Sequence, residues 1–286
     1  LYNVRKYQFE MGNRKPINNT IKLNANLKPE IKTSYEVGVD MKFLDNRLGF
    51  DFTYYYNTTK NQAMLVDASS PWTQQWVNAG KINNTGVEFM LYGTPVKTRD
   101  FQFDITANLA HNSSTVKELA DGVNRVYFAG DSNMPVKVGA VKGGKLGDIF
   151  ANNLMQRDAQ GRVIIGADGL PMAATGDGNL EQYLLDHPIG NIQPDLLMSI
   201  TPTFTYKGIS LTAMFDMKFG GDIVSVSEGM ATSVGTSERT AYRGEYKTVN
   251  GVQDWYMVVP GVKADGSVNT QEVSAQKYYS TIGLNS

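Results

Sequence analysis

The sequence contains no cysteine, and no long run of apolar residues occurs in its 286 positions. Without cysteine, both a disulfide framework and a thiolate metal site are excluded. No apolar run approaches the ~18 residues that a membrane helix needs, so a helical membrane protein is excluded as well. A β-barrel stays open, because its alternating side chains hide the apolar residues from an average over a window.

An excess of charge is also missing, since 27 Lys and Arg balance 28 Asp and Glu. This balance produces no overall field that would attract nucleic acid or anionic lipid. Histidine is scarce, and neither His111 nor His187 lies in a metal-spaced cluster or beside a nucleophile signature. We therefore predict no catalytic residue, no metal site and no cofactor, and a protein that is not an enzyme.

What the sequence does contain is a pattern of period two, clearest in residues 34–57. Every odd position from Tyr35 to Phe43 is apolar, and the even positions between them are small, polar or charged. Asp45 and Asn46 suit a tight turn, and the alternation then resumes from Leu48. Successive strand side chains point to opposite faces, so the pattern predicts a hairpin with one apolar and one polar face. Each strand runs about ten residues, near the ~9 to 11 of a tilted membrane strand.

The same pattern predicts four further strands, at residues 82–92, 101–112, 197–206 and 209–218. Pro202 removes a ladder donor, so we expect a bulge or a strand start beside it. The intervening stretches lose the alternation and are predicted to be long loops: 58–81, 113–195 and 219–286. Shorter features are expected within the irregular parts: an extended piece at 7–11, a hairpin at 157–171, a helical turn at 179–185 and a short extended run at 255–259.

The predicted fold is all-β, an antiparallel meander of about six long strands with short turns at one end and long loops at the other. Outer-membrane barrels have this asymmetry. A soluble antiparallel sandwich also alternates and also has loops. Strand length, the aromatic cluster Tyr54–Tyr56 and mid-strand charges opposite unbroken apolar faces favour the barrel. A basic residue facing lipid at mid-depth costs roughly 2 to 4 kcal/mol, so Lys42 is predicted to face a polar lumen.

The chain resembles the C-terminal barrel region of the SusC/RagA family, the TonB-dependent outer-membrane transporters of Bacteroidetes-type bacteria. The resemblance lies in four segments that occur in the family's order: LKPEIKTSYEVGVDMKFLDNRLGFDFTYYYNTTKNQ, NAGKINNTGVEFMLYGTPV, IGNIQPDLLMSITPTFTYKGISLTAMFDMKFGGDIVS and VPGVKADGSVNTQEVSAQKYYSTIG. It implies a large barrel of about 22 strands with long extracellular loops, set in outer-membrane lipid.

The resemblance further implies uptake of oligosaccharides or peptides through the TonB complex, with a SusD-like surface lipoprotein as the partner and no role for nucleic acid. Residues 1–286 are then expected to be one partial barrel domain that lacks the plug, the TonB-contacting segment and the final strands. About six strands cannot close a barrel, and open sheet edges are not tolerated in hydrocarbon. The chain is therefore expected to be an internal fragment of a longer transporter.

Three tryptophans in the predicted loops are the candidate residues for contact with substrate or partner: Trp72, Trp76 and Trp255. Their rings would stack on sugars or pack against a lid protein, and the alternative is that they anchor loops or join the interfacial aromatic belt. Five carboxylates are predicted to face the lumen and to hydrogen-bond the plug: Glu36, Asp40, Asp51, Glu88 and Asp104. The alternative function is a β-rich cell-surface module for binding or adhesion.

Overall fold

The computed structural model describes residues 7–10, 13–16, 21–22, 24–67, 74–120, 122–129 and 135–283. The chain divides into two compact units. The sheet unit contains residues 1–127, 139–148 and 191–222, and the mixed unit contains residues 128–138, 149–190 and 223–286. Within the described residues, no helix has both the length and the apolar character needed to cross a membrane.

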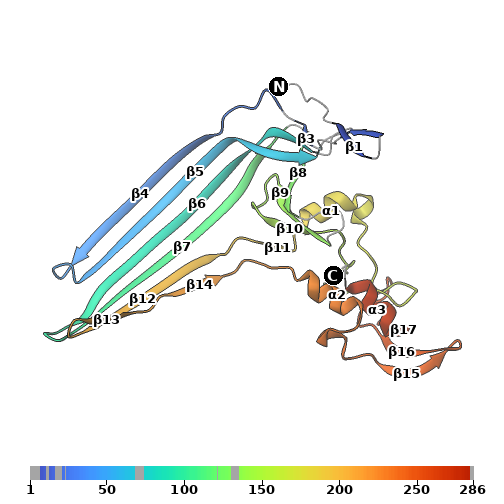
Figure 1. Cartoon of the computed structure of the whole chain (residues 1–286). Coiled ribbons are helices and arrows are strands. Elements are labelled where there is room, and N and C mark those ends of the chain that lie inside the picture. Colours follow the sequence, from blue (N-terminus) through green and yellow to red (C-terminus); the bar gives the residue numbers. More distant parts are fainter. Residues whose placement is uncertain are drawn as a thin grey trace. The chain divides into compact units, whose positions relative to one another are not determined.

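The sheet unit is built around an antiparallel meander, whose strands run side by side in Figure 1. Their order across the sheet is β13, β12, β7, β6, β5, β4, with β14 also paired to β12. The bounds are β4 Ile31–Phe43, β5 Leu48–Asp67, β6 Gln74–Lys97, β7 Phe101–Leu119, β12 Leu196–Tyr206, β13 Ile209–Thr212 and β14 Phe215–Phe219. The predicted meander of long strands is confirmed.

The register of the strands sorts the side chains onto two faces. One row of directly paired residues crosses six strands and is entirely apolar: Val39, Phe52, Phe89, Leu109, Met198 and Met217. The neighbouring row is largely polar: Asp40, Asp51, Met90, Asn108, Ser199 and Asp216. Adjacent residues of a strand point to opposite sides, so the sheet has one apolar face and one polar face.

Short turns join the strands at one end of the sheet. Leu44, Asp45 and Asn46 adopt φ values of 54°, 52° and 65°, as a tight reversal between β4 and β5 requires. Lys207 and Gly208 form the two-residue turn between β12 and β13, with φ values of 45° and 85°. The turn predicted at Asp45 and Asn46 is confirmed, and the second turn joins the strands predicted at 197–206 and 209–218.

The expected irregularity at Pro202 is present. The predicted strand at 209–218 is divided into β13 and β14, and the gap between them lies opposite Pro202. The N–H of Ala213 donates to the carbonyl oxygen of Pro202 at 3.2 Å, which keeps the two chains together across the gap. On its other side Pro202 pairs with Ile105 in β7. The N–H that Pro202 lacks would point to the same side as its carbonyl, toward the gap, where one ladder bond is therefore missing.

The predicted loop at residues 58–81 is wrong. There β5 continues to Asp67 and β6 begins at Gln74, and β7 also continues beyond its predicted end to Leu119. A buried cluster of Met64, Ile82 and Val126 supports this extension. Asn78 in β6 links the segment before β4 to the extended part of β5. Its Nδ2 donates to the carbonyl oxygens of Lys28 and Asn61, both at 2.8 Å.

Short strands and two helical segments lie between β7 and β12, in the stretch predicted to be irregular. A four-stranded sheet has the order β11, β10, β9, β8, with bounds Gly190–Asn191, Asp148–Ala151, Val136–Val141 and Arg125–Ala129. The predicted helical turn at 179–185 is confirmed as α1, Leu180–Asp186, which follows the 3-10 turn η1, Gly176–Gly178. Isolated pairings of Arg157 with Val163 and of Ile165 with Pro171 confirm the hairpin-like character of 157–171.

The predicted loop at 219–286 is also wrong, because the mixed unit folds much of it. Its elements are α2 Val226–Ser233, η2 Glu238–Thr240, β15 Glu245–Val249, β16 Val252–Val258, β17 Glu272–Ser274 and α3 Ala275–Ile282. Two small cores support them, one of Ile165, Leu170, Val259 and Val273, the other of Met257, Ala275 and Tyr279. These strands are too short for an alternation to stand out in the sequence.

The first strands of the chain are short. β1, Tyr7–Glu10, pairs with β2, Asn13–Pro16, which agrees with the extended piece predicted at 7–11. β3, Ile21–Lys22, pairs in parallel with β6.

Candidate functional site

A groove runs along the polar face of the sheet unit. It has a volume of about 560 Å³ and crosses β5, β6, β7, β12 and β14. Asp51, Asn108, Ser199 and Asp216 come from the polar row, and Glu88, Ala110, Leu197 and Lys218 come from the next row along the strands. The register of the meander therefore assembles the groove from residues up to 167 positions apart, from Asp51 to Lys218.

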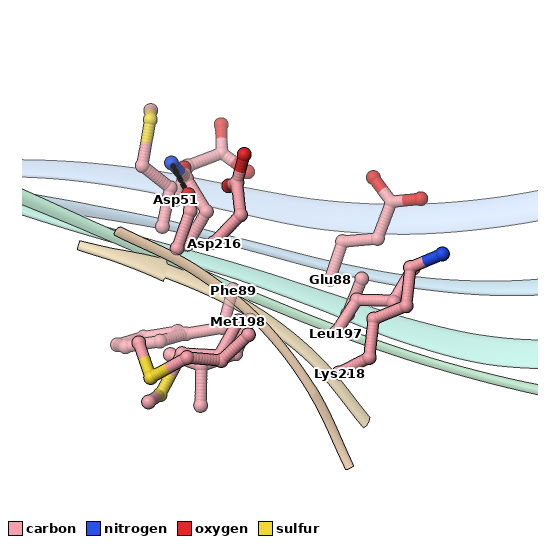
Figure 2. A pocket seen from close by; sticks show the side chains of 13 residues that line it. Asp51, Glu88, Phe89, Leu197, Met198, Asp216 and Lys218 are labelled. Atoms are coloured by element: carbon pink, nitrogen blue, oxygen red, sulfur yellow. Dashed lines mark hydrogen bonds between the residues drawn. The ribbon is translucent and has the colours of Figure 1, made fainter. Parts of the chain in front are cut away.

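The charged groups of the groove are three carboxylates and the amine of Lys218, set among apolar side chains. Figure 2 shows Asp51, Glu88 and Asp216 on one side of the sheet, with Phe89 and Met198 on the other. Between the carboxylates, the Asn108 amide donates to the Ser199 hydroxyl at 3.1 Å. These side chains offer hydrogen-bond acceptors and a few donors to a polar molecule bound in the groove.

The five predicted lumen carboxylates all lie at polar-face positions of the strands. The Lys42 Nζ forms an ion pair with the Asp40 carboxylate at 3.3 Å, which places Lys42 on the polar face as predicted. Asp104 accepts hydrogen bonds from Thr94 at 2.6 Å and from Gln102. Only Asp51 and Glu88 of the five border the groove. Their contact with a plug stays a prediction.

Sequence reasoning missed four groove residues: Asn108, Ser199, Asp216 and Lys218. All four fall on the polar positions of predicted strands, so the period-two pattern placed them on the right face. It did not bring them together, because their alignment depends on the register between strands, which no residue type specifies by itself.

The three candidate tryptophans lie in different places. Trp72 is outside the described residues. Trp76 is in strand β6 opposite Leu65, and Trp255 is in strand β16, where its ring lies 5.3 Å from that of Tyr246. The prediction that Trp76 and Trp255 lie in loops is therefore wrong, because pairing continues through both segments. They belong to different compact units, and their contact with substrate or partner stays a prediction.

Neither histidine forms part of a reactive arrangement in the described residues. His111 is exposed, and its Nδ1 lies 2.5 Å from the carbonyl oxygen of Asp195. His187 stacks on Tyr183 at 4.2 Å, one turn earlier in α1. Among the residues that the structure covers, no three His, Asp or Glu side chains come close enough together to hold a metal ion.

A long antiparallel meander with one continuous apolar face and one polar face is the wall of a β-barrel that stands in a membrane. Comparison with known proteins agrees. The family described as "TonB dependent receptor-like, beta-barrel" matches residues 4–153, and the chain belongs to this family. It is a family of outer-membrane β-barrels that act as transporters and receptors rather than as enzymes.

Curated relatives place the chain more narrowly. It is 27% identical to the TonB-dependent receptor SusC of Bacteroides thetaiotaomicron over 234 residues, which cover 77% of this chain and 22% of SusC. It is 26% identical to the TonB-dependent receptor P3 of Formosa agariphila over 217 residues, which cover 71% of this chain and 22% of that receptor. The chain thus spans about a fifth of the length of these relatives.

Solved structures share the fold. A structure of the RagAB peptide transporter aligns with 81% of this chain and 26% of its own, with a TM-score of 0.61 and 21% identity. The RagAB peptide importer in its closed-closed state aligns with 83% of this chain and 26% of its own, with a TM-score of 0.59 and 20% identity. The match to SusC confirms the predicted resemblance to the SusC/RagA family, and these neighbours show the shared fold.

Proposed function

We propose that this chain is a section of the barrel wall of a TonB-dependent transporter that imports oligosaccharides or peptides across the outer membrane. The observation that carries the proposal is the two-faced meander, with an unbroken apolar row on one side and a groove of carboxylates and amides on the other. The apolar face contacts lipid, and the polar face lines the lumen.

Import then depends on three components that act with this section of the barrel wall: a plug, the TonB complex and a surface lipoprotein. Lumen carboxylates such as Asp51 and Glu88 hydrogen-bond a plug, and the TonB complex supplies the energy that moves the plug. A SusD-like surface lipoprotein covers the long connections as a lid, with Trp76 and Trp255 as candidate contacts. The similarity to SusC and to a peptide transporter supports the class of protein and leaves both kinds of cargo open.

We assign residues 1–286 to one partial barrel domain. The sheet unit contributes strands of the wall, and the mixed unit is built from the connection between β7 and β12 and from the residues after β14. Long connections that fold on their own are typical of the extracellular side of large outer-membrane barrels.

The first test uses the full-length protein in its own bacterium. We expect it in the outer membrane as a heat-modifiable barrel, and we expect its deletion to abolish growth on one class of glycan or peptide. Loss of TonB function should abolish the same growth. A protein that reaches the cell surface and supports adherence but no TonB-dependent uptake would favour the adhesion module instead.

The second test reads the two faces directly, at neighbouring residues of β12. A nitroxide attached to Met198→Cys should collide with oxygen dissolved in lipid and be shielded from a water-soluble nickel complex. A nitroxide at Ser199→Cys should show no preference for the lipid-soluble collider, because it faces the lumen. The chain contains no cysteine, so each label occupies a single position within it. Equal preference for the lipid-soluble collider at both sites would contradict the barrel wall.

A further inference from the structure

The apolar face changes its chemistry in a regular order along β5 and β6. Successive directly opposed pairs on this face begin with two apolar phenylalanines, pass to tyrosines and then to hydroxyl and amide side chains, and end with two lysines: Phe52 and Phe89, Tyr54 and Val87, Tyr56 and Thr85, Thr58 and Asn83, Lys60 and Lys81. This order matches the profile of a bilayer from its hydrocarbon core through the aromatic belt to the charged headgroups.

The polar pairs in this series are joined by hydrogen bonds. The Asn83 amide donates to the Tyr56 hydroxyl at 2.6 Å, and Thr58 donates to the Asn83 side-chain oxygen at 3.2 Å. From Tyr56 to Lys60 the strand rises by roughly 13 Å, at about 3.3 Å per residue. With the usual tilt of barrel strands, this corresponds to roughly 10 Å in height above the aromatic level. A lysine side chain at that height reaches the phosphates of the headgroup layer.

Among the described residues, the two lysines together have a single ion-pair contact. Lys60 and Lys81 are directly opposite each other on adjacent strands, an arrangement that is destabilising for like charges. Glu118 lies 3.6 Å from Lys81, in the next strand, and its side chain is 64% exposed. Lys60 has no ion-pair partner among the residues that the structure describes, and its other neighbour in the row is Ile31. The nearby Glu30 carboxylate already accepts from the N–H of Ala63 at 2.8 Å.

A polar cavity of about 320 Å³ adjoins the pair, bordered by both lysines, Asn61, Asn78 and Glu118. Its volume accommodates a phosphate with part of the group that carries it. We propose that Lys60 and Lys81 bind the phosphate of a lipid in the outer leaflet of the outer membrane. The inference rests on the proposed function, because it needs the apolar face to stand in that membrane. The chain as a whole is nearly neutral, so the attraction is local to this pair.

The test is titration of the full-length, detergent-folded protein with lipid A, followed by native mass spectrometry. Dephosphorylated lipid A serves as the neutral ligand. We expect the phosphorylated lipid to bind more tightly, with a loss of about fivefold for Lys60→Gln or Lys81→Gln and more for the double variant. Lys42→Gln is the matched control, because Lys42 lies on the polar face and pairs with Asp40. It should bind lipid A as the unsubstituted protein does.

Three results would overturn the inference. One is a double variant that keeps the full preference for phosphorylated lipid. Another is an equal loss in the Lys42→Gln control. The third is displacement of lipid A by inorganic phosphate at a concentration similar to that of the lipid. This would mean that Lys60 and Lys81 bind a free anion rather than a lipid. Unboiled and boiled samples are compared on gels to verify that each variant is folded. Failure of the proposed function is read separately, from fractionation and TonB-dependent growth.

Discussion

In the sheet unit, Val37 and Ile209 are 73% and 78% exposed, whereas Ile165 and Val259 in the mixed unit are each 2% exposed. Burial of apolar surface stabilises a fold by about 25 cal/mol per Å² wherever it occurs. The mixed unit achieves it with small cores of its own. Among its described residues, the sheet unit has one small core of Met64, Ile82 and Val126 beside the extended strands, whereas Val37 and Ile209 belong to no buried cluster. The stability of its apolar face therefore depends on what covers that face from outside, which in the proposed function is lipid.

The comparison predicts that truncating one isoleucine matters more in the mixed unit. Ile165→Ala should destabilise that unit by about 2 to 5 kcal/mol, because it removes buried contacts and leaves a cavity. Ile209→Ala should cost less, about 1 to 2 kcal/mol, because it removes apolar surface from lipid but leaves no cavity, since lipid fills the space. Denaturant-dependent pulse proteolysis of the full-length protein measures both. Equal losses would mean that Ile209 packs against protein.

A charge placed on the apolar face tests the sheet unit next. Phe52→Arg should cost about 2 to 4 kcal/mol, because it exposes a guanidinium to hydrocarbon near mid-depth. Thr53→Arg, one residue later on the polar face, should cost distinctly less. The measurement is the free energy of unfolding from lipid vesicles, with assembly in the outer membrane as a second readout. A costly Thr53→Arg beside a harmless Phe52→Arg would reverse our assignment of the faces.

Close packing on the polar face gives a smaller expected effect. A Cβ at Gly86 would lie 2.3 Å from the Tyr55 hydroxyl and 2.7 Å from the backbone oxygen of His111. Gly86→Ala should therefore cost about 1 to 3 kcal/mol through overpacking. Gly93→Ala in the same strand is the control, since its Cβ would meet its nearest neighbour at 3.5 Å, an ordinary contact. Similar unfolding midpoints for the two variants would argue against this reasoning.

The weakest predicted effect concerns an exposed ion pair in the mixed unit. The hydrogen bond from Lys247 Nζ to Glu272, at 2.6 Å, raises the pKa of Lys247 above its ordinary 10.5, and the charges of Glu272 and Glu245 add to the shift. On the alkaline side the pair therefore stays formed up to pH 10.5 and is lost as the pH rises through the raised pKa of Lys247.

Competitive acetylation followed by mass spectrometry reports the pKa of Lys247 in the intact protein. Glu272→Gln should lower that pKa more than Glu245→Gln, because Glu272 provides the shorter contact, 2.6 Å against 3.7 Å. An equal shift in the two variants would show that the charges act without the specific hydrogen bond.

The opening hairpin shows how far sequence patterns reach. Its alternation, its turn at Asp45 and Asn46 and its two faces were all predictable, because one face must be apolar over the whole membrane thickness. The extensions of β5, β6 and β7 were not predictable in this way. Beyond the aromatic level both faces carry many polar residues, so the strands are held mainly by backbone pairing and leave no periodic signal.

In the groove, too, the sequence predicted the face on which a residue lies but not the residues that come to lie beside it. Asp51 and Glu88 were recognisable as polar-face residues, because each interrupts an apolar series at a fixed parity. Their meeting with Asp216 and Lys218 was not, because more than a hundred residues and several turns separate them. Trp76 and Trp255 were misplaced for a related reason, since a tryptophan in a polar stretch gives no sign of the strand partner beside it.

By itself, the sequence determined the strand type, the two faces and the short turns, because these depend on the order of neighbouring residues and on local backbone preferences. It also determined the family, through four segments in a common order. Only the tertiary structure decided the register, and with it the row from Asp51 to Asp216 and the opposition of Lys60 and Lys81. The physical reason is that backbone pairing is nearly indifferent to side-chain identity. Which residues come to lie opposite one another therefore follows from turn geometry and face burial over the whole sheet.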